Sequence, residues 1–121
     1  MKISTIAELL NAEVVFGEDM LERDVHSACG CDMMSDVLAF VKDQAVLLTG
    51  LCNQQVIRTA QMMDMYCVVF VRGKQPSDEI IALAKEAEIA VLATDMRMYS
   101  ACGILYTNGL IGSTARVEGD L

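Results

Sequence analysis

The chain has 121 residues and a formal net charge of −8. Its length favours a single domain, and its acidic balance argues against nucleic-acid binding, because no cluster of Lys and Arg offsets the negative charge. It has no apolar stretch typical of a signal peptide and no run long enough for a membrane span, so we expect a cytoplasmic protein. Its five cysteines, an odd number, fit a reducing compartment.

Hydrophobic residues make up 54% of the chain, which is a high fraction for a small domain with much surface per volume. A well-filled core is one explanation. We favour a second one, in which some apolar surface is covered in a homodimer, because exposed apolar patches usually mark interfaces. Methionines gather over residues 62–65, where they either fill the core or form an interface at a helix end.

The N-terminal part of the chain predicts a helix and two short strands. Thr5 has the spacing of a capping box with the glutamate three residues later, which predicts a helix over residues 4–10. Asn11 is suited to end this helix in a left-handed conformation. Residues 14–16 predict a strand, and residues 25–31 predict another with weak alternation.

Three apolar runs at nearly constant spacing dominate the rest of the chain, at residues 45–48, 67–71 and 89–93. Strands that are buried on both faces have continuous apolar runs of this kind. The spacing leaves room for a loop and a helix after each strand. Right-handed crossovers then place these helices on the faces of a parallel sheet.

Each helix of this part of the chain is preceded by a side chain that can cap it. The first of them, ahead of residue 45, is expected to extend through Lys42. In chain order, the candidate caps are Asp32 or Ser35, Asn53, Ser77, and Thr94 or Asp95. We therefore predict one α/β domain over residues 1–110, with a mixed, largely parallel sheet flanked by helices, and an irregular C-terminal tail over residues 111–121.

The loops that follow the three apolar runs are the predicted binding site. In open parallel sheets, ligands bind at the carboxyl ends of the strands, and helix N-termini favour anions there. We expect a small anionic ligand such as a nucleotide; the alternative is that these basic and glycine residues only solubilise and shape loop tips. The candidate ligand-binding residues are Thr49, Gly50, Asn53, Arg72, Gly73, Lys74, Ser77, Thr94, Asp95 and Arg97.

The cysteines allow an alternative site. Cys29 and Cys31 are separated by one residue, and Cys52 lies at a predicted strand end from which it can approach them. A thiolate metal or redox site is one interpretation; the other is that free cysteines behave as small hydrophobic residues. The second is favoured, because the spacing differs from that of typical zinc pairs and no second pair completes a ligand set. We therefore predict neither a metal nor another cofactor.

No complete catalytic constellation is present in the sequence. His26 is the only histidine, and no nucleophile motif accompanies it. Asp95 is a candidate acid, but capping of a helix explains it more simply. An enzyme needs convergent titratable groups in one pocket, so we predict a protein without catalytic residues.

The order of these elements resembles the DRTGG domain over nearly all of residues 1–110. Residues 50–55, Gly-Leu-Cys-Asn-Gln-Gln, stand where the naming motif falls, and they lack its Asp, Arg, Thr and paired Gly in order. The chain is therefore similar to a stand-alone member with a degenerate signature loop. The segments that carry the resemblance are residues 6–10, 14–18, 30–35, 48–50, 72–79, 82–84 and 91–94.

The resemblance implies a fold similar to the N-terminal domains of HPr kinase/phosphorylase and of Mur ligases. It also implies a regulatory or accessory module, since the domain accompanies CBS modules in some pyrophosphatases. Stand-alone members similar to this chain accompany redox enzymes of anaerobes, which makes such an enzyme or a regulatory target an expected partner. The alternative function is a cysteine-based metal or redox accessory protein linked to an anaerobic redox enzyme.

Overall fold

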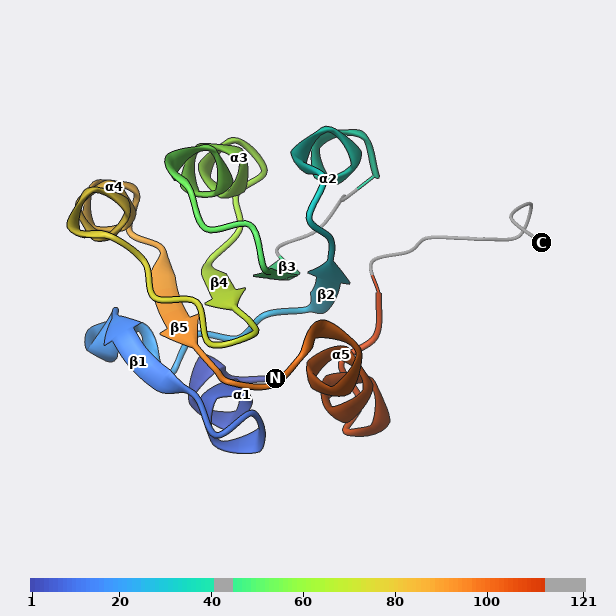
Figure 1. Ribbon diagram of the computed structural model, residues 1–121. Helices are drawn as coiled ribbons and strands as arrows, with labels where there is room; N and C mark the ends of the chain where they lie inside the picture. The colour runs from blue at the N-terminus through green and yellow to red at the C-terminus, as the bar shows by residue number, and fades with distance from the viewer. Residues whose placement is uncertain (41–44, 113–121) are drawn as a thin grey trace.

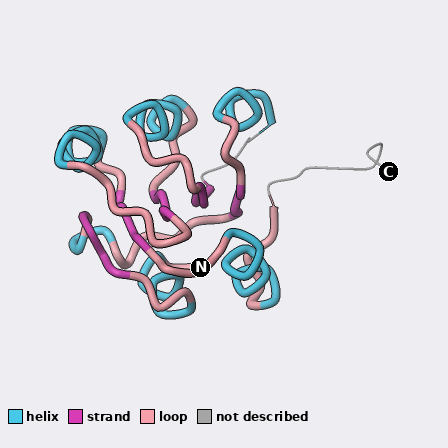
Figure 2. Tube along the Cα trace, in the orientation of Figure 1, coloured by secondary structure: helices cyan, strands magenta, loops and turns pink. Residues whose placement is uncertain are grey.

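The computed structural model describes residues 1–40 and 45–112, which form a five-stranded sheet with helices on both faces (Figures 1 and 2). The strand order is β1-β5-β4-β3-β2. The elements are α1 Ile3–Leu9, β1 Glu13–Phe16, the short 3-10 helix η1 Glu18–Met20, β2 Ser27–Gly30, α2 Met34–Phe40, β3 Ala45–Thr49, α3 Gln54–Met62, β4 Cys67–Phe70, α4 Asp78–Ala87, β5 Ala90–Ala93 and α5 Met98–Thr107.

The sheet is mixed and largely parallel, as predicted. Strands β2, β3, β4 and β5 pair in parallel, whereas β1 runs antiparallel to β5 with Val14 opposite Leu92. In the three central strands every residue is buried, which explains their continuous apolar sequences. The edge strands β1 and β2 are partly exposed.

Successive residues of the central strands enter two cores, one on each face of the sheet. Val46 and Leu48 pack on the side of α1 and α5, while Leu47 packs on the side of α2, α3 and α4 (Figure 1). Burial of a Val or Leu side chain contributes about 1.5–3 kcal/mol each. The two cores therefore hold the helices against the sheet, and they fix the loops at the two ends of the strands.

The expected capping box at the first helix is wrong. Helix α1 begins at Ile3, so Thr5 lies inside it, and no side chain caps its start. The N–H groups of Ile3 and Ser4 instead donate to the backbone carbonyls of Arg23 and Leu21, at 3.0 and 2.9 Å. The free donors of a helix start can be satisfied by any acceptor, and here a distant segment supplies the acceptors. Asn11 is left-handed, as predicted, with φ 49°.

Two of the other predicted caps are confirmed. Asn53 Oδ1 and Ser77 Oγ each accept a hydrogen bond of 3.3 Å from the N–H three residues later, at Val56 and Ile80. These bonds fix the starts of α3 and α4 at the carboxyl edge of the sheet.

The caps predicted for α2 and α5 differ from the structure. Helix α2 begins at Met34, which places Ser35 inside it, and the Asp32 carboxylate accepts from Thr49 and Gly50 instead. Residue 42, the predicted end of α2, lies outside the described residues. Helix α5 begins at Met98 after Arg97, without a side-chain cap.

The predicted tail begins beside an edge strand. The N–H of Ala28 in β2 donates to the carbonyl of Ile111 at 3.0 Å, and Gly112 forms a parallel bridge with Ala28. Residues 113–121 of the predicted tail lie outside the described residues. Within the described ranges, no helix combines the length and the apolar character that crossing a membrane requires.

Candidate functional site

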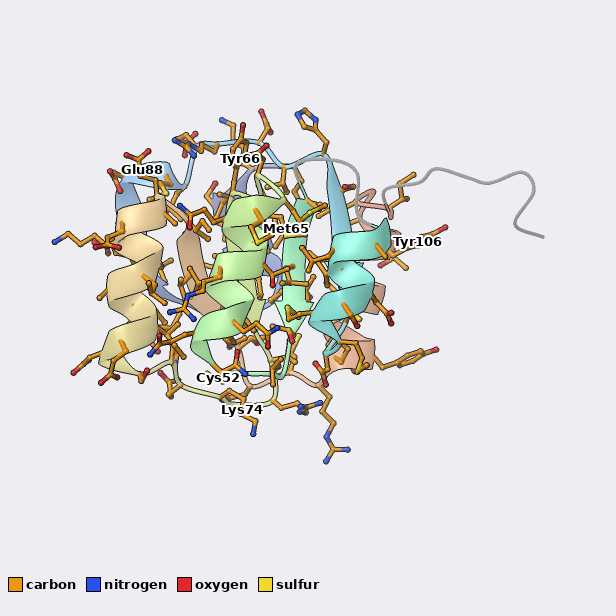
Figure 3. All side chains as sticks on the ribbon, turned by 90° about the horizontal axis from the view of Figure 1, so that it is seen from above. Cys52, Met65, Tyr66, Lys74, Glu88 and Tyr106 are labelled. Carbon is orange, nitrogen blue, oxygen red and sulfur yellow. The ribbon has the colours of Figure 1, made fainter. Side chains whose placement is uncertain are left out.

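Four loops lie at the carboxyl edge of the sheet, because four parallel strands end there. They follow β2, β3, β4 and β5 and comprise residues 31–33, 50–53, 71–77 and 94–97. Figure 3 shows Cys52 and Lys74 at this edge, with Tyr66 and Glu88 at the opposite end of the molecule. The three loops predicted to form a site therefore do converge, and a fourth joins them.

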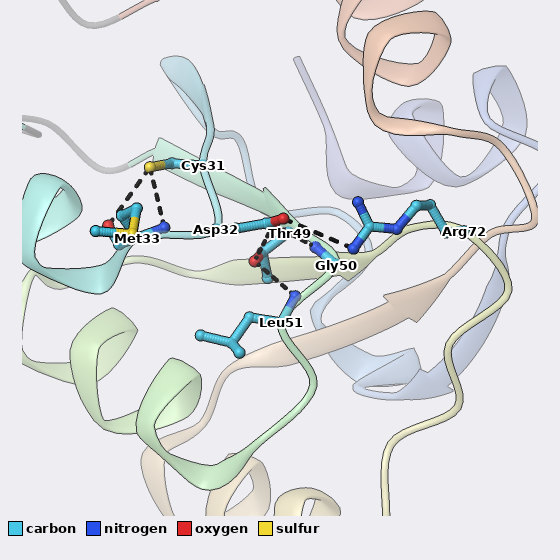
Figure 4. A network of polar contacts seen from close by, with 7 residues as sticks. All are labelled: Cys31, Asp32, Met33, Thr49, Gly50, Leu51 and Arg72. Carbon is cyan, nitrogen blue, oxygen red and sulfur yellow. Dashed lines mark hydrogen bonds and ion pairs between the residues drawn. The ribbon is translucent and has the colours of Figure 1, made fainter.

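The carboxylate of Asp32, from the loop after β2, lies at the centre of this edge (Figure 4). Asp32 Oδ1 accepts a hydrogen bond of 2.8 Å from the Gly50 N–H and another of 3.1 Å from the Thr49 hydroxyl. Its Oδ2 lies 3.6 Å from Nη2 of Arg72. The Thr49 hydroxyl also accepts from the Leu51 N–H at 3.1 Å, which holds the loop after β3 in place.

This arrangement stabilises negative charge. The Gly50 N–H holds the pKa of Asp32 below its usual range, and the Thr49 hydroxyl and the Arg72 guanidinium act in the same direction. Partial burial opposes them and raises the pKa. The donors together lower the pKa of Asp32 more than burial raises it, because each donor interacts directly with the charged form. At neutral pH the centre of the edge therefore holds an ionised carboxylate.

Gly50 leaves the space that the Arg72 guanidinium occupies. A Cβ atom added at Gly50 would collide with the guanidinium of Arg72. Arg72 and Gly73 are both left-handed, with φ 64° and 72°, which turns the chain sharply after β4. Two backbone bonds fix this turn to the loop after β5: Arg72 N donates to the carbonyl of Met96 at 2.8 Å, and Gly73 N to that of Thr94 at 3.0 Å.

The Thr94 side chain connects the loop after β5 to the other side of the sheet. Its buried hydroxyl donates to the carbonyl of Leu10 at 2.8 Å and accepts from the Met96 N–H at 3.2 Å. These bonds replace the capping role predicted for Thr94. They hold the carbonyls that receive the Arg72 and Gly73 N–H groups, so the edge is a connected set of loops.

A profile of the DRTGG domain matches residues 5–107. The chain belongs to the DRTGG domain family. It has no match among curated proteins. A similar solved structure contains the CBS and DRTGG domains of the regulatory region of Clostridium perfringens pyrophosphatase, complexed with its activator, diadenosine tetraphosphate. The TM-score is 0.71 at 21% sequence identity, over 86% of this chain and 45% of that chain, so this chain spans less than half of the other.

In this DRTGG domain the degenerate signature loop is the segment over Gly50. It provides a backbone donor, whereas the acidic and basic side chains come from the neighbouring loops through Asp32 and Arg72. The charged partners of the loop after β3 are therefore contributed by residues distant in sequence.

The predicted site residues of the DRTGG domain fall into two groups. Thr49, Gly50 and Arg72 meet around Asp32, and Gly73 and Thr94 are bonded to each other. The remaining residues line the same edge without joining this network: Asn53 and Ser77 as helix caps, and Lys74, Asp95 and Arg97 as exposed loop residues. Among the ion pairs of the described residues, none involves Lys74 or Arg97.

Asp32, the carboxylate at the centre of the carboxyl edge, was not among the predicted binding residues. The sequence marked Asp32 only as a possible helix cap, because an aspartate before a helix has that local signal. Its partners lie 17 and 18 residues away, in a different loop. Only the parallel pairing of β2 with β3 brings the two loops together, and the sequence predicted the first of these strands from weak alternation alone.

Cys29, Cys31 and Cys52 were the alternative metal ligands, and all three are free in the structure. Within residues 1–40 and 45–112, no three His, Cys, Asp or Glu side chains are placed to hold a metal ion. Burial raises the pKa of Cys29 to about 11, and raises that of Cys52 although Lys74 opposes the shift. Protonated thiols are poor nucleophiles. The structure thus gives the alternative of Cys29, Cys31 and Cys52 as metal ligands no support.

Proposed function

We propose that this DRTGG domain is a non-enzymatic regulatory or accessory module that acts as a homodimer and binds a small phosphate-bearing ligand, such as a nucleotide, at the carboxyl edge of its sheet. The similar structure supports this proposal, because there the DRTGG domain is part of a regulatory region complexed with diadenosine tetraphosphate. The edge geometry of this chain supports it independently.

The carboxylate of Asp32 carries the proposal. It receives a backbone N–H, a hydroxyl and a guanidinium, which is the donor set that binds a phosphate oxygen. We call the donors of Thr49, Gly50 and Arg72 the cradle. Within the chain itself, the Asp32 carboxylate is the anion that these donors hold. A phosphate-bearing ligand would take these donors in its place, and the exposed Asp32 side chain would turn toward water. The Asp32 carboxylate then acts as an internal competitor of the ligand.

The charges around the cradle indicate on which side the rest of the ligand lies. The first turn of α3 has no acidic residue, so its free N–H groups and partial positive charge remain attractive to an anion. The first turn of α4 contains Asp78 and Glu79, which repel one. Lys74 and Arg97 are exposed on the loops beside the cradle. These charges favour a ligand that lies over the loop after β3 and reaches Lys74 and Arg97.

The same groups argue against catalysis. A general base works best with a pKa near the operating pH, whereas the pKa of Asp32 is lowered from a value that is already acidic. Asp95 and His26 are both exposed, so neither lies in an enclosed pocket. Binding, without an acid or base to move protons, is the function that these residues support.

The test is a binding titration with inorganic phosphate, AMP, ATP and diadenosine tetraphosphate, followed by thermal unfolding and calorimetry. At least one phosphate compound is expected to raise the melting temperature, because a ligand that binds only the folded state stabilises it. The double variant Lys74→Ala, Arg97→Ala is expected to weaken binding roughly tenfold, about 1.4 kcal/mol.

Lys85→Ala is the matched control. Lys85 is an exposed lysine in the last turn of α4, away from the carboxyl edge, so its loss is expected to leave binding unchanged. Absence of stabilisation by every phosphate compound would overturn the ligand proposal. Equal weakening in the control and the double variant would place the ligand elsewhere.

A further inference from the structure

Helix α5 differs from the other helices of the described chain in that it contains no charged residue. One face packs on the core through Ala101 and Leu105, which are buried. The opposite face is uncharged and aromatic: Tyr99 and Tyr106 are 92% and 64% exposed, with Ser100 and Thr107 beside them. Large aromatic side chains exposed together on an uncharged surface usually mark an interface. Within the described chain, nothing covers this outer face.

The outer face of α5 is shaped as a notch between two aromatic rings. Gly103 lies between Tyr99, four residues before it, and Tyr106, three residues after it, so all three share one side of the helix. Nothing lies within 4 Å of the position of a Cβ atom at Gly103. An open groove of about 630 Å³ runs along this face. Figure 3 shows Tyr106 at the outer margin of the molecule.

We infer that this face binds the same face of a second copy of the chain, with the two α5 helices antiparallel and crossing at Gly103. This inference names the surface of the dimer proposed above, and it rests on that part of the proposed function. The arrangement is self-complementary, because a two-fold axis near Gly103 puts Tyr99 of each copy opposite Tyr106 of the other. The missing side chain at Gly103 lets the two helices approach closely.

Charge favours a second copy as the occupant. Each chain has a formal net charge of −8, so two copies repel one another over most of their surfaces. The repulsion is weakest where the contact itself contains no charge, as along α5. A basic partner would instead be drawn to the acidic surfaces elsewhere. The uncharged aromatic face is therefore suited to a like-charged copy.

The exposed tyrosine rings offer a large part of the area that a stable contact needs. A buried tyrosine covers about 150–250 Å², so the four rings of two copies would contribute roughly 600–1,000 Å². A standard interface buries about 1,200–2,000 Å² in total. The rings would therefore supply about half of the contact, and Ile104 and Cys102, which line the groove, adjoin them.

The test is sedimentation of the full chain over a wide concentration range, with wild type, Tyr106→Asp and Met62→Asp. The Tyr106→Asp variant puts two negative charges into the proposed contact, so its dimer dissociation constant is expected to rise by about 30-fold or more. Met62 on α3 is 70% exposed and is the matched control. Its replacement is expected to leave the dimer intact. Circular dichroism verifies that each variant is folded, as expected for changes at exposed positions.

Each outcome decides between specific alternatives. A dimer that survives Tyr106→Asp together with Tyr99→Asp would overturn this surface while leaving the dimer standing. A dimer lost only in Met62→Asp would move the interface to the methionine-rich end of α3. A wild type that stays monomeric at every concentration would overturn both the surface and the proposed dimer. None of these results affects ligand binding, which the titration with phosphate compounds measures separately.

Discussion

The two ends of the parallel strands have opposite electrostatic character. At the carboxyl edge, Arg72 supports an ionised carboxylate and the helices begin. At the amino edge α3 and α4 end, and acidic residues stand just after them: Asp64 and Glu88, both left-handed with φ 55° and 58°. There Arg23 stacks over Tyr66 at 4.9 Å, beside a cavity of about 260 Å³.

This contrast shows which edge can receive an anion. Helix N-termini carry partial positive charge and C-termini partial negative charge. At the amino edge, the carboxylates of Asp64 and Glu88 add to the negative ends of two helices, which makes this edge repel phosphate despite its cavity. A hollow surface alone therefore does not identify a binding site, and the direction of the helices and the donor set favour the proposed site at the carboxyl edge.

The largest effect is expected from filling the cradle at the carboxyl edge. In Gly50→Val, the new side chain displaces the Arg72 guanidinium and covers the backbone donor. Loss of one charge-assisted hydrogen bond costs about 1.5–3 kcal/mol, so affinity for the phosphate compound that binds wild type is expected to fall roughly ten- to hundredfold. Calorimetry measures it. Ala82→Val, an exposed change on α4, is the control. Equal affinity in both variants would remove Gly50 from the site.

The next effect concerns how firmly the carboxyl edge is built. In Thr94→Val the buried carbonyl of Leu10 loses its donor, and the Met96 N–H loses its acceptor. An unsatisfied buried group costs about 1–3 kcal/mol of unfolding free energy, which urea unfolding measures. Thr107→Val is the matched change, because the Thr107 hydroxyl is exposed and donates only to carbonyls of its own helix. A loss no greater than that of Thr107→Val would show that the Thr94 bonds do not stabilise the edge.

A smaller effect is expected at the central carboxylate. Because the pKa of Asp32 is lowered in the folded state, its ionised form stabilises the fold above the unfolded pKa, and this stability is lost as pH falls through the folded pKa. Asp32→Asn is expected to cost about 1 kcal/mol or less at neutral pH, since the side chain is 45% exposed, and nothing in strong acid. Urea unfolding across pH measures this difference.

The same substitution tests whether Asp32 competes with the ligand for the cradle or holds Arg72 in position to bind it. Without its negative charge, residue 32 no longer competes for the cradle, so affinity for a phosphate compound is expected to rise roughly tenfold. Calorimetry of wild type and Asp32→Asn with the same compound decides. A fall in affinity would mean that Asp32 holds Arg72 in position for the ligand and does not compete with it.

The smallest effect is expected at the amino edge. Glu88 is left-handed after the end of α4, a conformation that glycine adopts without strain. Glu88→Gly is expected to raise the unfolding free energy by about 0.5–1 kcal/mol and to leave ligand affinity unchanged. Gly73→Ala, at φ 72° on the other edge, is expected to lower the unfolding free energy by a similar amount. A change in affinity in Glu88→Gly would move the ligand to the amino edge.

The sequence predicted those parts of the fold that depend on local signals. The strands β3, β4 and β5 have continuous apolar sequences because both faces are buried, and Asn53 and Ser77 cap helices through the N–H three residues later. The family resemblance was confirmed by the profile match over residues 5–107. The dimer and the ligand stay predictions.

The roles that the sequence did not reveal depend on contacts between distant segments. The Thr94 hydroxyl donates to a carbonyl 84 residues away, and the Gly50 N–H donates to Asp32 Oδ1 of a different loop. The predicted capping by Thr5 failed because carbonyls of residues 21 and 23 satisfy the start of α1. Each of these side chains has a plausible local partner, and tertiary structure supplied a different one.

The bridge between Ala28 and Gly112 has a consequence for behaviour at high concentration. An open sheet edge offers unpaired N–H and C=O groups to any other chain and can seed intermolecular β-sheet aggregation. Here β2 is short, and the Ala28 N–H is already bonded to Ile111 of the same chain. The edge nearest α5 is thus blunted against strand addition, so contact between copies on this side is directed to side chains and away from the backbone.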